Sequence, residues 1–242
     1  MNGTNWKPAD YRIARRKLSL TQIAEVAYPS VCRCDWVKTG FCLIDLGAEF
    51  GSRAMRAGMV EMVAEFDRLF REVRRKRLDI QSMTRFDQQS TTKPHRDGSD
   101  EESVLVLGYE PTLIDSRLFL SDFSVCAGSQ GLYPAEFLEK FNPMYARGAK
   151  LLTPFTTELT EFNPRHFQIL IINNSCARGK LNGRTMQGVL HHAEVPHPRT
   201  DALRIINSVV LTPQPLHSQP RLPIEERQRF LESDELSEYS RT

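Results

Sequence analysis

Hydrophobic residues recur with a helical spacing in the first third of the chain. Between residues 52 and 77, apolar side chains stand three or four positions apart, which predicts one long amphipathic helix. Residues 18–27 have the same spacing and predict a shorter helix. The apolar run at residues 41–46 lies between Gly40 and Gly47 and predicts a strand. We therefore expect residues 1–78 to form an N-terminal segment of helices and strand that packs on the rest of the fold.

From residue 79 the hydrophobic pattern changes to a period of two, which is typical of strands. About seven or eight short strands in roughly 130 residues predict a mainly β fold with flanking helices, such as a β-sandwich or jelly roll. The long helix has a wide apolar face, so we expect two facing sheets with this helix covering one of them. The strand-like runs are residues 78–89, 102–110, 116–125, 149–159, 166–175, 186–195 and 203–212.

Two stretches depart from the strand pattern. Residues 128–148 are expected to form a helical insert, with one short helix at residues 134–141. Beyond residue 212 the chain is first rich in proline and then polar, which predicts an extended linker followed by an exposed helix or a loose tail. Residues 79–212 are thus expected to form the core, and residues 213–242 a C-terminal extension.

Composition and charge place the chain among ordinary globular proteins. It has 242 residues, of which 40% are hydrophobic and 26% charged, and its net charge is +2. The overall charge therefore gives no reason to expect nucleic acid or a membrane as a partner. No apolar run reaches the ~20 residues of a membrane helix, and the first residues lack the apolar stretch of a secretory signal. We expect a cytoplasmic protein.

A cluster of basic residues ends the long helix, and two explanations compete for it. The cluster could form a nucleic-acid patch, or its cations could lie at a helix C-terminus because the helix dipole favours them there. No aromatic residues interleave with these charges, which favours the second explanation. The residues are Arg71, Arg74, Arg75, Lys76 and Arg77.

The cysteines do not form a recognisable disulfide framework, because their number is odd and their spacing irregular. Cys32 and Cys34 could be half of a zinc knuckle, but the sequence contains no second close pair. Reduced thiols agree with a cytoplasmic location. The five residues are Cys32, Cys34, Cys42, Cys126 and Cys176.

The candidate chemistry begins at His95 and Asp97, just before the predicted strand at residues 102–110. Residues i and i+2 of an extended chain point to the same side, so this imidazole and carboxylate can meet at one metal ion. The pair alone is a weak signal, because solvated loops carry the same residues. His191 or His192 offers a third ligand about a hundred residues later, and two histidines with one carboxylate are the ligand set of non-haem Fe(II) oxygenases.

Arg204 adds a cation to this set. It stands between Leu203 and Ile205 in an apolar run that predicts a strand, and an arginine is costly to bury there unless it meets an anion. The alternative is a strand whose other face is exposed, which would leave Arg204 in water. In the first case an anionic ligand is expected beside it.

In order, spacing and strand context, these residues resemble the motifs of the Fe(II)/2-oxoglutarate-dependent dioxygenases. The resemblance covers residues 83–211 and implies a double-stranded β-helix, a jelly roll of the cupin type. It implies that His95, Asp97 and one distal histidine bind Fe(II), and that Arg204 binds the distal carboxylate of 2-oxoglutarate. It also implies O₂ as co-substrate and a hydroxylated product.

The motif leaves two neighbours open as the distal ligand. The family context G-x-L-H-x-A favours His191, and strand alternation places His191 on one face with Val189 and Ala193. A family variant with valine three residues after the ligand favours His192 instead, with Val195 in that place. The remaining candidates, His166 and His197, lie beside predicted turns, so we expect structural or exposed roles for them.

The sequence also departs from the family pattern. Phe86 stands nine residues before His95, where many members have a tyrosine, so it offers no hydroxyl to the keto-acid. Ile206 stands where some members have a serine two residues after the arginine. The insert at residues 128–148 and the N-terminal segment are candidates to cover the substrate, because loops on a rigid barrel usually carry specificity.

Two other kinds of protein share parts of this pattern. A cupin-like metalloenzyme would use the same metal ligands without 2-oxoglutarate, and a non-catalytic β-barrel binding protein would keep the fold without the metal. Arg204 argues against the first, because such an enzyme has no need of an anion anchor at that place. The expected partner is a small-molecule or peptide substrate rather than nucleic acid; the sequence leaves the oligomeric state open.

Overall fold

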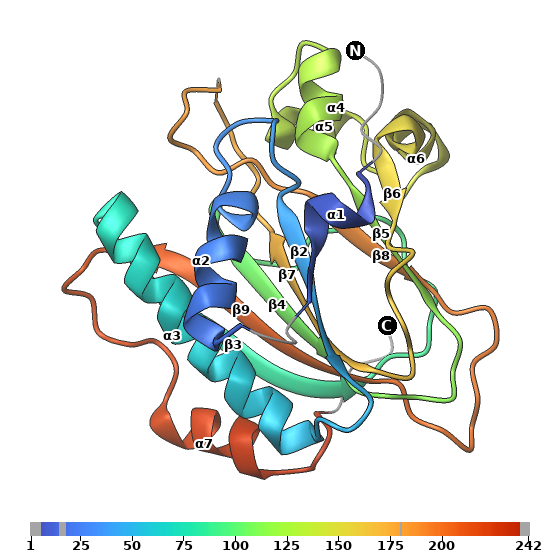
Figure 1. The fold of residues 1–242 in the computed structure, drawn as a ribbon. Helices are drawn as coiled ribbons and strands as arrows, with labels where there is room; N and C mark the ends of the chain where they lie inside the picture. Colours follow the sequence, from blue (N-terminus) through green and yellow to red (C-terminus); the bar gives the residue numbers. More distant parts are fainter. Residues whose placement is uncertain (1–5, 15–17, 180, 238–242) are drawn as a thin grey trace.

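A computed structural model describes residues 6–14, 18–179 and 181–237 of the chain (Figure 1). The fold is rich in sheet, with helices on its flanks, as the hydrophobic pattern predicts. Six strands form a mixed sheet in the order β1–β2–β7–β4–β9–β3, and three form a smaller sheet in the order β6–β5–β8. The larger sheet contains β1 (Arg12–Ala14), β2 (Phe41–Gly47), β7 (Phe167–Asn173), β4 (Val104–Tyr109), β9 (Ile205–Gln214) and β3 (Arg77–Asp87). The smaller sheet contains β6 (Thr156–Glu158), β5 (Arg117–Ser121) and β8 (Leu190–Glu194).

Strand β4 separates the two halves of the core. It pairs antiparallel with β7 on one side and β9 on the other, and all six of its residues are buried. Its alternate side chains enter different clusters, because successive residues of a strand point to opposite faces. Val104 and Val106 face the helices, whereas Leu105, Leu107 and Tyr109 pack with residues of the smaller sheet.

Helices α2 (Leu20–Val31) and α3 (Ser52–Arg74) cover the outer face of the larger sheet (Figure 1). The apolar stripe of α3 is buried there, including Met55, Met59 and Phe66. Gly108 of β4 permits this approach, because a Cβ at that position would overlap the sulfur of Met59. The predicted helix at residues 52–77 ends earlier, at Arg74, because Arg75 adopts the left-handed conformation with φ 55° and the chain then enters β3.

Strand β5 of the smaller sheet pairs with β6 and β8, and its inner side chains pack against those of the larger sheet. Leu118 and Leu120 of β5 meet Leu170 and Ile206 of the larger sheet in one apolar cluster. The interior between the two sheets is therefore the place where a ligand cavity can form.

Three helices and a 3₁₀ turn fill the connection from β5 to β6, and here two sequence predictions were partly wrong. The strand predicted at residues 116–125 ends at Ser121, because the carboxylate of Asp122 accepts a hydrogen bond from Val125 N (3.2 Å) and starts a helix. The strand predicted at residues 149–159 is extended only over β6. Its first part is helical, and Leu152 and Phe155 are buried against the neighbouring helices. The elements are α4 (Phe123–Ser129), α5 (Pro134–Lys140), α6 (Ala146–Leu152) and η2 (Thr153–Phe155).

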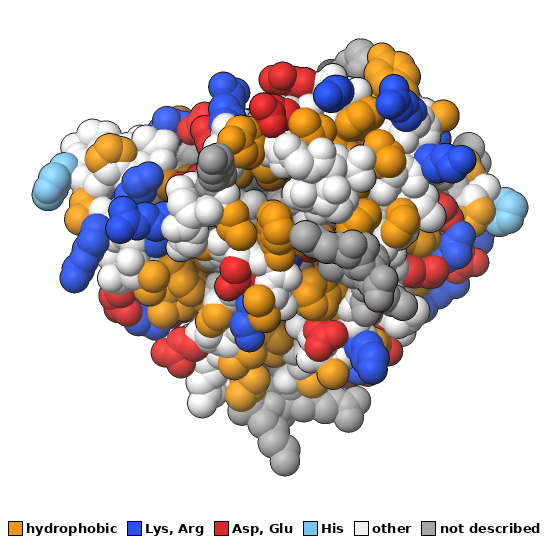
Figure 2. All heavy atoms as spheres, turned by 90° about the horizontal axis from the view of Figure 1, so that it is seen from above, with side chains coloured by type: hydrophobic (Ala, Val, Ile, Leu, Met, Phe, Trp, Pro, Cys, Tyr) orange, Lys and Arg blue, Asp and Glu red, His pale blue; other side chains and the backbone are white. Residues whose placement is uncertain are grey.

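These helices lie at the end of the molecule shown at the top of Figure 1. Seen from above, this end shows hydrophobic side chains toward its middle, and most of its lysine and arginine side chains lie nearer the margin (Figure 2). Met144 and Tyr145, just before α6, are among the exposed hydrophobic residues, at 55% and 72% exposure. This part of the chain therefore places apolar surface in contact with water.

Both ends of the described chain pack on the sheet. The short helix α1 (Pro8–Tyr11) leads into β1, which runs parallel to β2, so the N-terminal segment contributes two strands to the larger sheet. At the other end, α7 (Ile224–Glu232) buries Phe230 in the cluster beneath α3. Among the described residues, none of the helices has the length and apolar character needed to cross a membrane.

Candidate metal centre

Three side chains that the sequence predicts as ligands meet at one point. One ligand atom from each of His95, Asp97 and His191 lies within 4.8 Å of the other two. Asp97 Oδ1 is 3.6 Å from His95 Nε2 and 3.8 Å from His191 Nε2. The side chain of His191 is 12% exposed, against 35% for His95 and 30% for Asp97. The cluster is therefore closed on the His191 side and open to solvent on the other.

The backbone brings the two histidines together. His95 N donates to the carbonyl of His191 (3.1 Å), and His191 N donates to the carbonyl of His95 (3.0 Å). Three residues earlier, Thr92 N donates to the carbonyl of Ala193 (2.9 Å), and Ala193 N donates to the hydroxyl of Thr92 (3.0 Å). The segment before Asp97 therefore lies antiparallel beside β8 and forms an isolated bridge with it, although residues 95 and 191 are far apart in sequence.

Hydrogen bonding fixes which nitrogen of His95 is free. Its Nδ1 lies 2.7 Å from the carbonyl oxygen of Lys93. A carbonyl can only accept, so Nδ1 carries the proton, and the lone pair is on Nε2, the atom that faces Asp97. This arrangement, with one ring nitrogen donating to a carbonyl, is common for histidines that bind metals.

Burial opposes charge at this cluster. The pKa of His191 is held well below 6.5, first by burial and then by the neighbouring His95 and His192. Burial also raises the pKa of the Asp97 carboxyl, while His95 and Arg96 act in the opposite direction. A neutral imidazole is the form that binds a metal, and a partly buried carboxylate gains from a cation beside it.

The other four histidines lie apart from this cluster, and one of them, His217, is exposed beyond β9. His192 is stacked on Phe119, with ring centroids 4.7 Å apart and an interplanar angle of 11°. Burial lowers its pKa to about 4. His166 Nδ1 lies 3.0 Å from Asp45 Oδ1, and His197 is exposed. Of the two neighbours left open by the sequence, the fold brings His191 into the cluster, because successive side chains of β8 point to opposite faces.

Arg204 is a buried cation with an incomplete set of partners. It is 2% exposed. The sequence predicted Arg204 inside a strand, but it lies immediately before β9, which begins at Ile205. Its Nε donates to Ser116 Oγ (3.1 Å), and its Nη1 donates to both oxygens of Gln88, the main-chain one at 3.0 Å. Its guanidinium carbon lies 5.5 Å from the centre of the Tyr109 ring. Among the described residues, Nη2 has no hydrogen-bond partner although it is buried.

The electrostatics of Arg204 agree with this geometry. Burial lowers the pKa of its guanidinium, and Tyr109 and Asp87 act in the opposite direction. Within the described part of the chain, the guanidinium donates only to neutral groups of Ser116 and Gln88, and no carboxylate forms an ion pair with it. A buried guanidinium with one free N–H edge is a site for an anion.

One cavity of about 1110 Å³ contains both the cluster and Arg204. Its wall is largely apolar, which is typical of small-molecule sites, and its volume is slightly above the ~300–1,000 Å³ range for drug-sized ligands. Met144, at the exposed end of the helical insert, also lines it. The apolar residues of the inner wall include Phe86, Leu107, Leu118, Leu120, Leu170 and Ile206.

Sequence reasoning missed the residues that surround Arg204. Tyr109 could have been found, because it follows Leu105 and Leu107 at the inward positions of an alternating strand. Gln88 and Ser116 lie in connecting loops, where polar residues are common and carry no pattern. Arg85, another arginine on the strand that leads toward His95, is already paired with Glu110 (3.2 Å).

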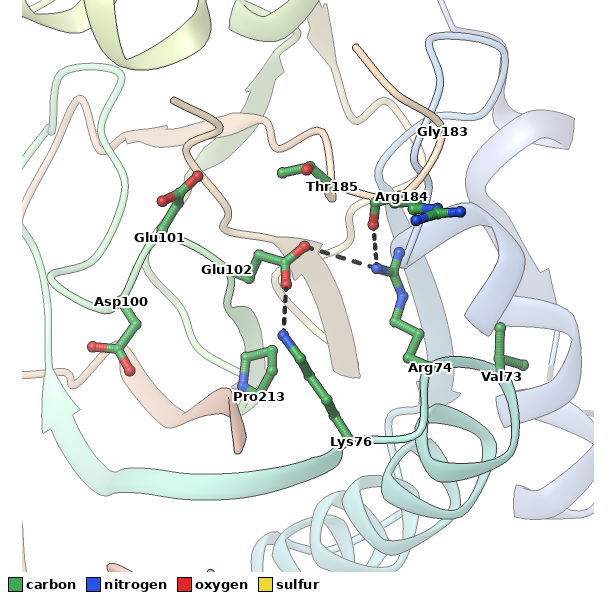
Figure 3. Close-up of a pocket in the computed structure, with 10 residues that line it drawn as sticks. All are labelled: Val73, Arg74, Lys76, Asp100, Glu101, Glu102, Gly183, Arg184, Thr185 and Pro213. Atoms are coloured by element: carbon green, nitrogen blue, oxygen red, sulfur yellow. Dashed lines mark hydrogen bonds and ion pairs between the residues drawn. The ribbon is translucent and has the colours of Figure 1, made fainter. Parts of the chain in front are cut away.

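A second cavity, of about 740 Å³, lies at the C-terminal end of α3 (Figure 3). Glu102 reaches between Arg74 (3.7 Å) and Lys76 (3.9 Å), two members of the basic run at the end of the helix. Arg74 also donates to the carbonyls of Cys32 and Arg184. Arg74 and Lys76 therefore make contacts within the chain, which join the loop after Asp97 to the segment before β8.

Comparisons with known proteins leave the function to be argued from this geometry. No family model matches the sequence, and a search of curated proteins gave no match. Among solved structures, the chain is similar to two of the iron and alpha-ketoglutarate-dependent endoperoxidase NvfI, one of them described as having a different conformation. The TM-scores are 0.41 and 0.39, with 11% and 10% sequence identity. Each match covers 71% of this chain, and 76% and 77% of the respective neighbour. Similarity at this level assigns neither an activity nor a substrate.

Proposed function

We propose that this protein is an Fe(II)- and 2-oxoglutarate-dependent dioxygenase that hydroxylates a small-molecule or peptide substrate. One observation carries the proposal. A single cavity holds a cluster of two imidazoles and a carboxylate together with a buried arginine whose Nη2 has no partner among the described residues. A keto-acid with a second carboxylate is a ligand that can use both features at once.

The donor set fits a divalent iron. Two histidines and one carboxylate leave further positions of an octahedral ion open for co-substrates. Asp97 Oδ1 lies 3.6 and 3.8 Å from the two imidazole nitrogens, and all three ligand atoms lie within 4.8 Å of one another, so one ion could contact all three. His95, Asp97 and His191 would hold it, with His192 as the alternative that the geometry disfavours.

Arg204 fits the distal carboxylate of 2-oxoglutarate. Its Nε and Nη1 are held by Ser116 and Gln88, which fixes the plane of the guanidinium and leaves Nη2 to donate to an incoming oxygen. A hydrogen bond to a charged group is worth roughly 1.5–3 kcal/mol. The ring of Tyr109 lies along the guanidinium and shields it from water.

Bound iron would supply the activation of O₂, with electrons from the oxidative decarboxylation of the keto-acid, for hydroxylation of a C–H bond. The protein contributes orientation and exclusion of water. His95 is held in one tautomer by Lys93, Arg204 fixes the far end of the co-substrate, and the apolar wall keeps the interior dry. The rest of the cavity, toward Met144, is left for the substrate.

The strand arrangement supports a double-stranded β-helix as the scaffold. The larger sheet carries β3, β9, β4 and β7 side by side, and the smaller carries β8, β5 and β6. An isolated bridge between His95 and His191 lies next to β8. The inner side chains of the two sheets pack together, and the bridge that carries His95 and His191 lies at β8, an edge strand of the smaller sheet.

Succinate release tests the proposal. The purified protein, given Fe(II), ascorbate, O₂ and 2-oxoglutarate, should form succinate slowly without substrate and faster with a suitable one. The Asp97→Ala variant should form none above the iron-only background. Stoichiometric iron binding without succinate or keto-acid binding would favour the cupin-like enzyme, and absence of metal binding would favour a non-catalytic barrel.

A further inference from the structure

The loop that carries Asp97 is hydrogen-bonded to Asn174, a residue distant in sequence. Asn174 follows β7 directly and is fully buried, at 0% exposure. Its side-chain Oδ1 accepts a hydrogen bond from Asp97 N (3.1 Å), and its Nδ2 donates to the carbonyl of Asp97 (3.1 Å). Both main-chain polar groups of the ligand residue are thus bound by one amide.

The orientation of this amide is unambiguous. A backbone N–H can only donate and a backbone carbonyl can only accept, so the oxygen of Asn174 must face Asp97 N and its nitrogen must face Asp97 O. The same nitrogen also lies 3.0 Å from the hydroxyls of Ser99 and Ser103. A side chain with only a donor or only an acceptor could not replace it.

Arg96, the residue between the two predicted ligands, forms further hydrogen bonds that connect this loop to Asn174. Its Nε donates to the main-chain carbonyl of Asn174 (3.0 Å), and its Nη2 donates to the carbonyl of Asp100 (2.7 Å). The side chain of Arg96 therefore points away from the side on which His95 and Asp97 meet. Asn174 holds the backbone of Asp97, while Arg96 holds the backbone of Asn174.

The carboxylate of Asp97 has no comparable support of its own. Within the described residues, its only close polar contacts are with the rings of His95 and His191. Those contacts are made inside the cluster and cannot set where the cluster forms. The position of the carboxylate is therefore set by its main chain, and the main chain is held by Asn174.

We propose that Asn174 is a positioning residue for the metal centre: it fixes the backbone of Asp97 so that the carboxylate reaches the ion bound by His95 and His191. The inference rests on the proposed function, since it takes Asp97 as a metal ligand. Loss of a residue that orients a ligand typically lowers metal affinity 10–100-fold.

Asn173 provides a matched control. It is the preceding residue and is also 0% exposed, but its side-chain oxygen accepts from Ser175 N (3.2 Å) rather than from the loop of Asp97. The same replacement at the two positions, Asn174→Leu and Asn173→Leu, removes a buried amide in each case. Only the first removes the support of Asp97.

The test measures Ni(II) binding by calorimetry, because Ni(II) binds nitrogen and oxygen ligands more tightly than Fe(II) and is stable in air. Asn174→Leu should weaken Ni(II) binding tenfold or more, and Asn173→Leu should change it less than about threefold. In an Asp97→Ala background, Asn174→Leu should have no further effect, because its action passes through Asp97. Thermal unfolding without metal shows that each variant is folded. If either leucine variant does not fold, Asn174→Ser and Asn173→Ser replace the pair.

The outcomes separate the two claims. Equal losses in the two leucine variants, or an undiminished effect of Asn174→Leu in the Asp97→Ala background, would mean that Asn174 only stabilises the fold. Unchanged binding by Asn174→Leu would likewise overturn the inference. If the unmodified protein binds no Ni(II), the proposed metal centre itself fails.

Discussion

At the scale of single residues, the sequence is informative where rare side chains occur in a fixed order. His95, Asp97 and His191 could be named because few other histidines compete and because alternation assigns each to a face. Arg204 could be named because an arginine among apolar neighbours is unusual. Asn174, Gln88 and Ser116 could not, since polar residues in loops have no periodicity, and only the folded chain shows which groups they bind.

The choice between the neighbouring histidines gives the sharpest residue-scale prediction. His191→Ala should abolish stoichiometric Fe(II) binding, because it removes a ligand atom from the cluster. His192→Ala should largely keep it, because that ring is stacked on Phe119 outside the cluster. Anaerobic equilibrium dialysis against Fe(II) distinguishes them. The opposite pattern would show that β8 runs in the other phase, since a slip of one residue exchanges its faces.

At the scale of elements, periodicity predicted the long elements well and the short ones poorly. Helix α3 and the strands β3, β4, β7 and β9 are long enough for several repeats of their pattern. Helix α6 has only seven residues and no side-chain cap, so Leu151 and Leu152 could belong equally to a strand or a helix. An aspartate such as Asp122 is a common helix N-cap, so the start of α4 could have been predicted. The alternating residues before it instead extended the predicted strand to residue 125.

Asp122 also links elements through a buried ion pair. Both oxygens of its carboxylate accept from Arg33 (2.7 and 2.8 Å), and both side chains are almost completely buried. Arg33→Met should lower the free energy of unfolding by roughly 3–5 kcal/mol, because it leaves a buried carboxylate unpaired. Urea denaturation measures this. Arg12→Met, at partly exposed ion pairs with Glu161 and Asp45, should have a smaller effect. Equal losses would show that the buried pair has no special role.

At the scale of the whole molecule, segments expected to be peripheral are integrated into the fold. The N-terminal segment supplies β1 and β2 to the larger sheet, and the C-terminal extension returns to α3. Beyond α7, Asp234 Oδ1 lies 2.8 Å from a nitrogen of the fully buried Arg56. Sequence polarity could not reveal this, because the extension buries few of its residues and exposes the rest.

The C-terminal extension should therefore contribute to stability. Phe230→Ala removes a ring that is 5% exposed and should cost about 3–5 kcal/mol of unfolding free energy. Ile224→Ala, in the same helix but at 78% exposure, should stay within about 0.5 kcal/mol. Chemical denaturation of the two variants provides the comparison. A loose tail would give two equally small changes.

The central claim is that one cavity binds iron at His95, Asp97 and His191 and a keto-acid between that iron and Arg204. The most direct measurement is an anaerobic titration of the Fe(II)-loaded protein with 2-oxoglutarate, followed by the visible charge-transfer band of the chelate. The unmodified protein should give a saturable band.

Arg204→Met should keep iron but raise the apparent Kd for 2-oxoglutarate about tenfold or more, since 1.4 kcal/mol is a factor of ten. Arg204→Lys should give a smaller loss, because it keeps the charge without the planar fork. Arg199→Met, at an exposed arginine of the same cavity that is paired with Asp201, should titrate like the unmodified protein. An unmodified protein without the band, or an Arg204→Met variant with an unchanged titration, would contradict the account.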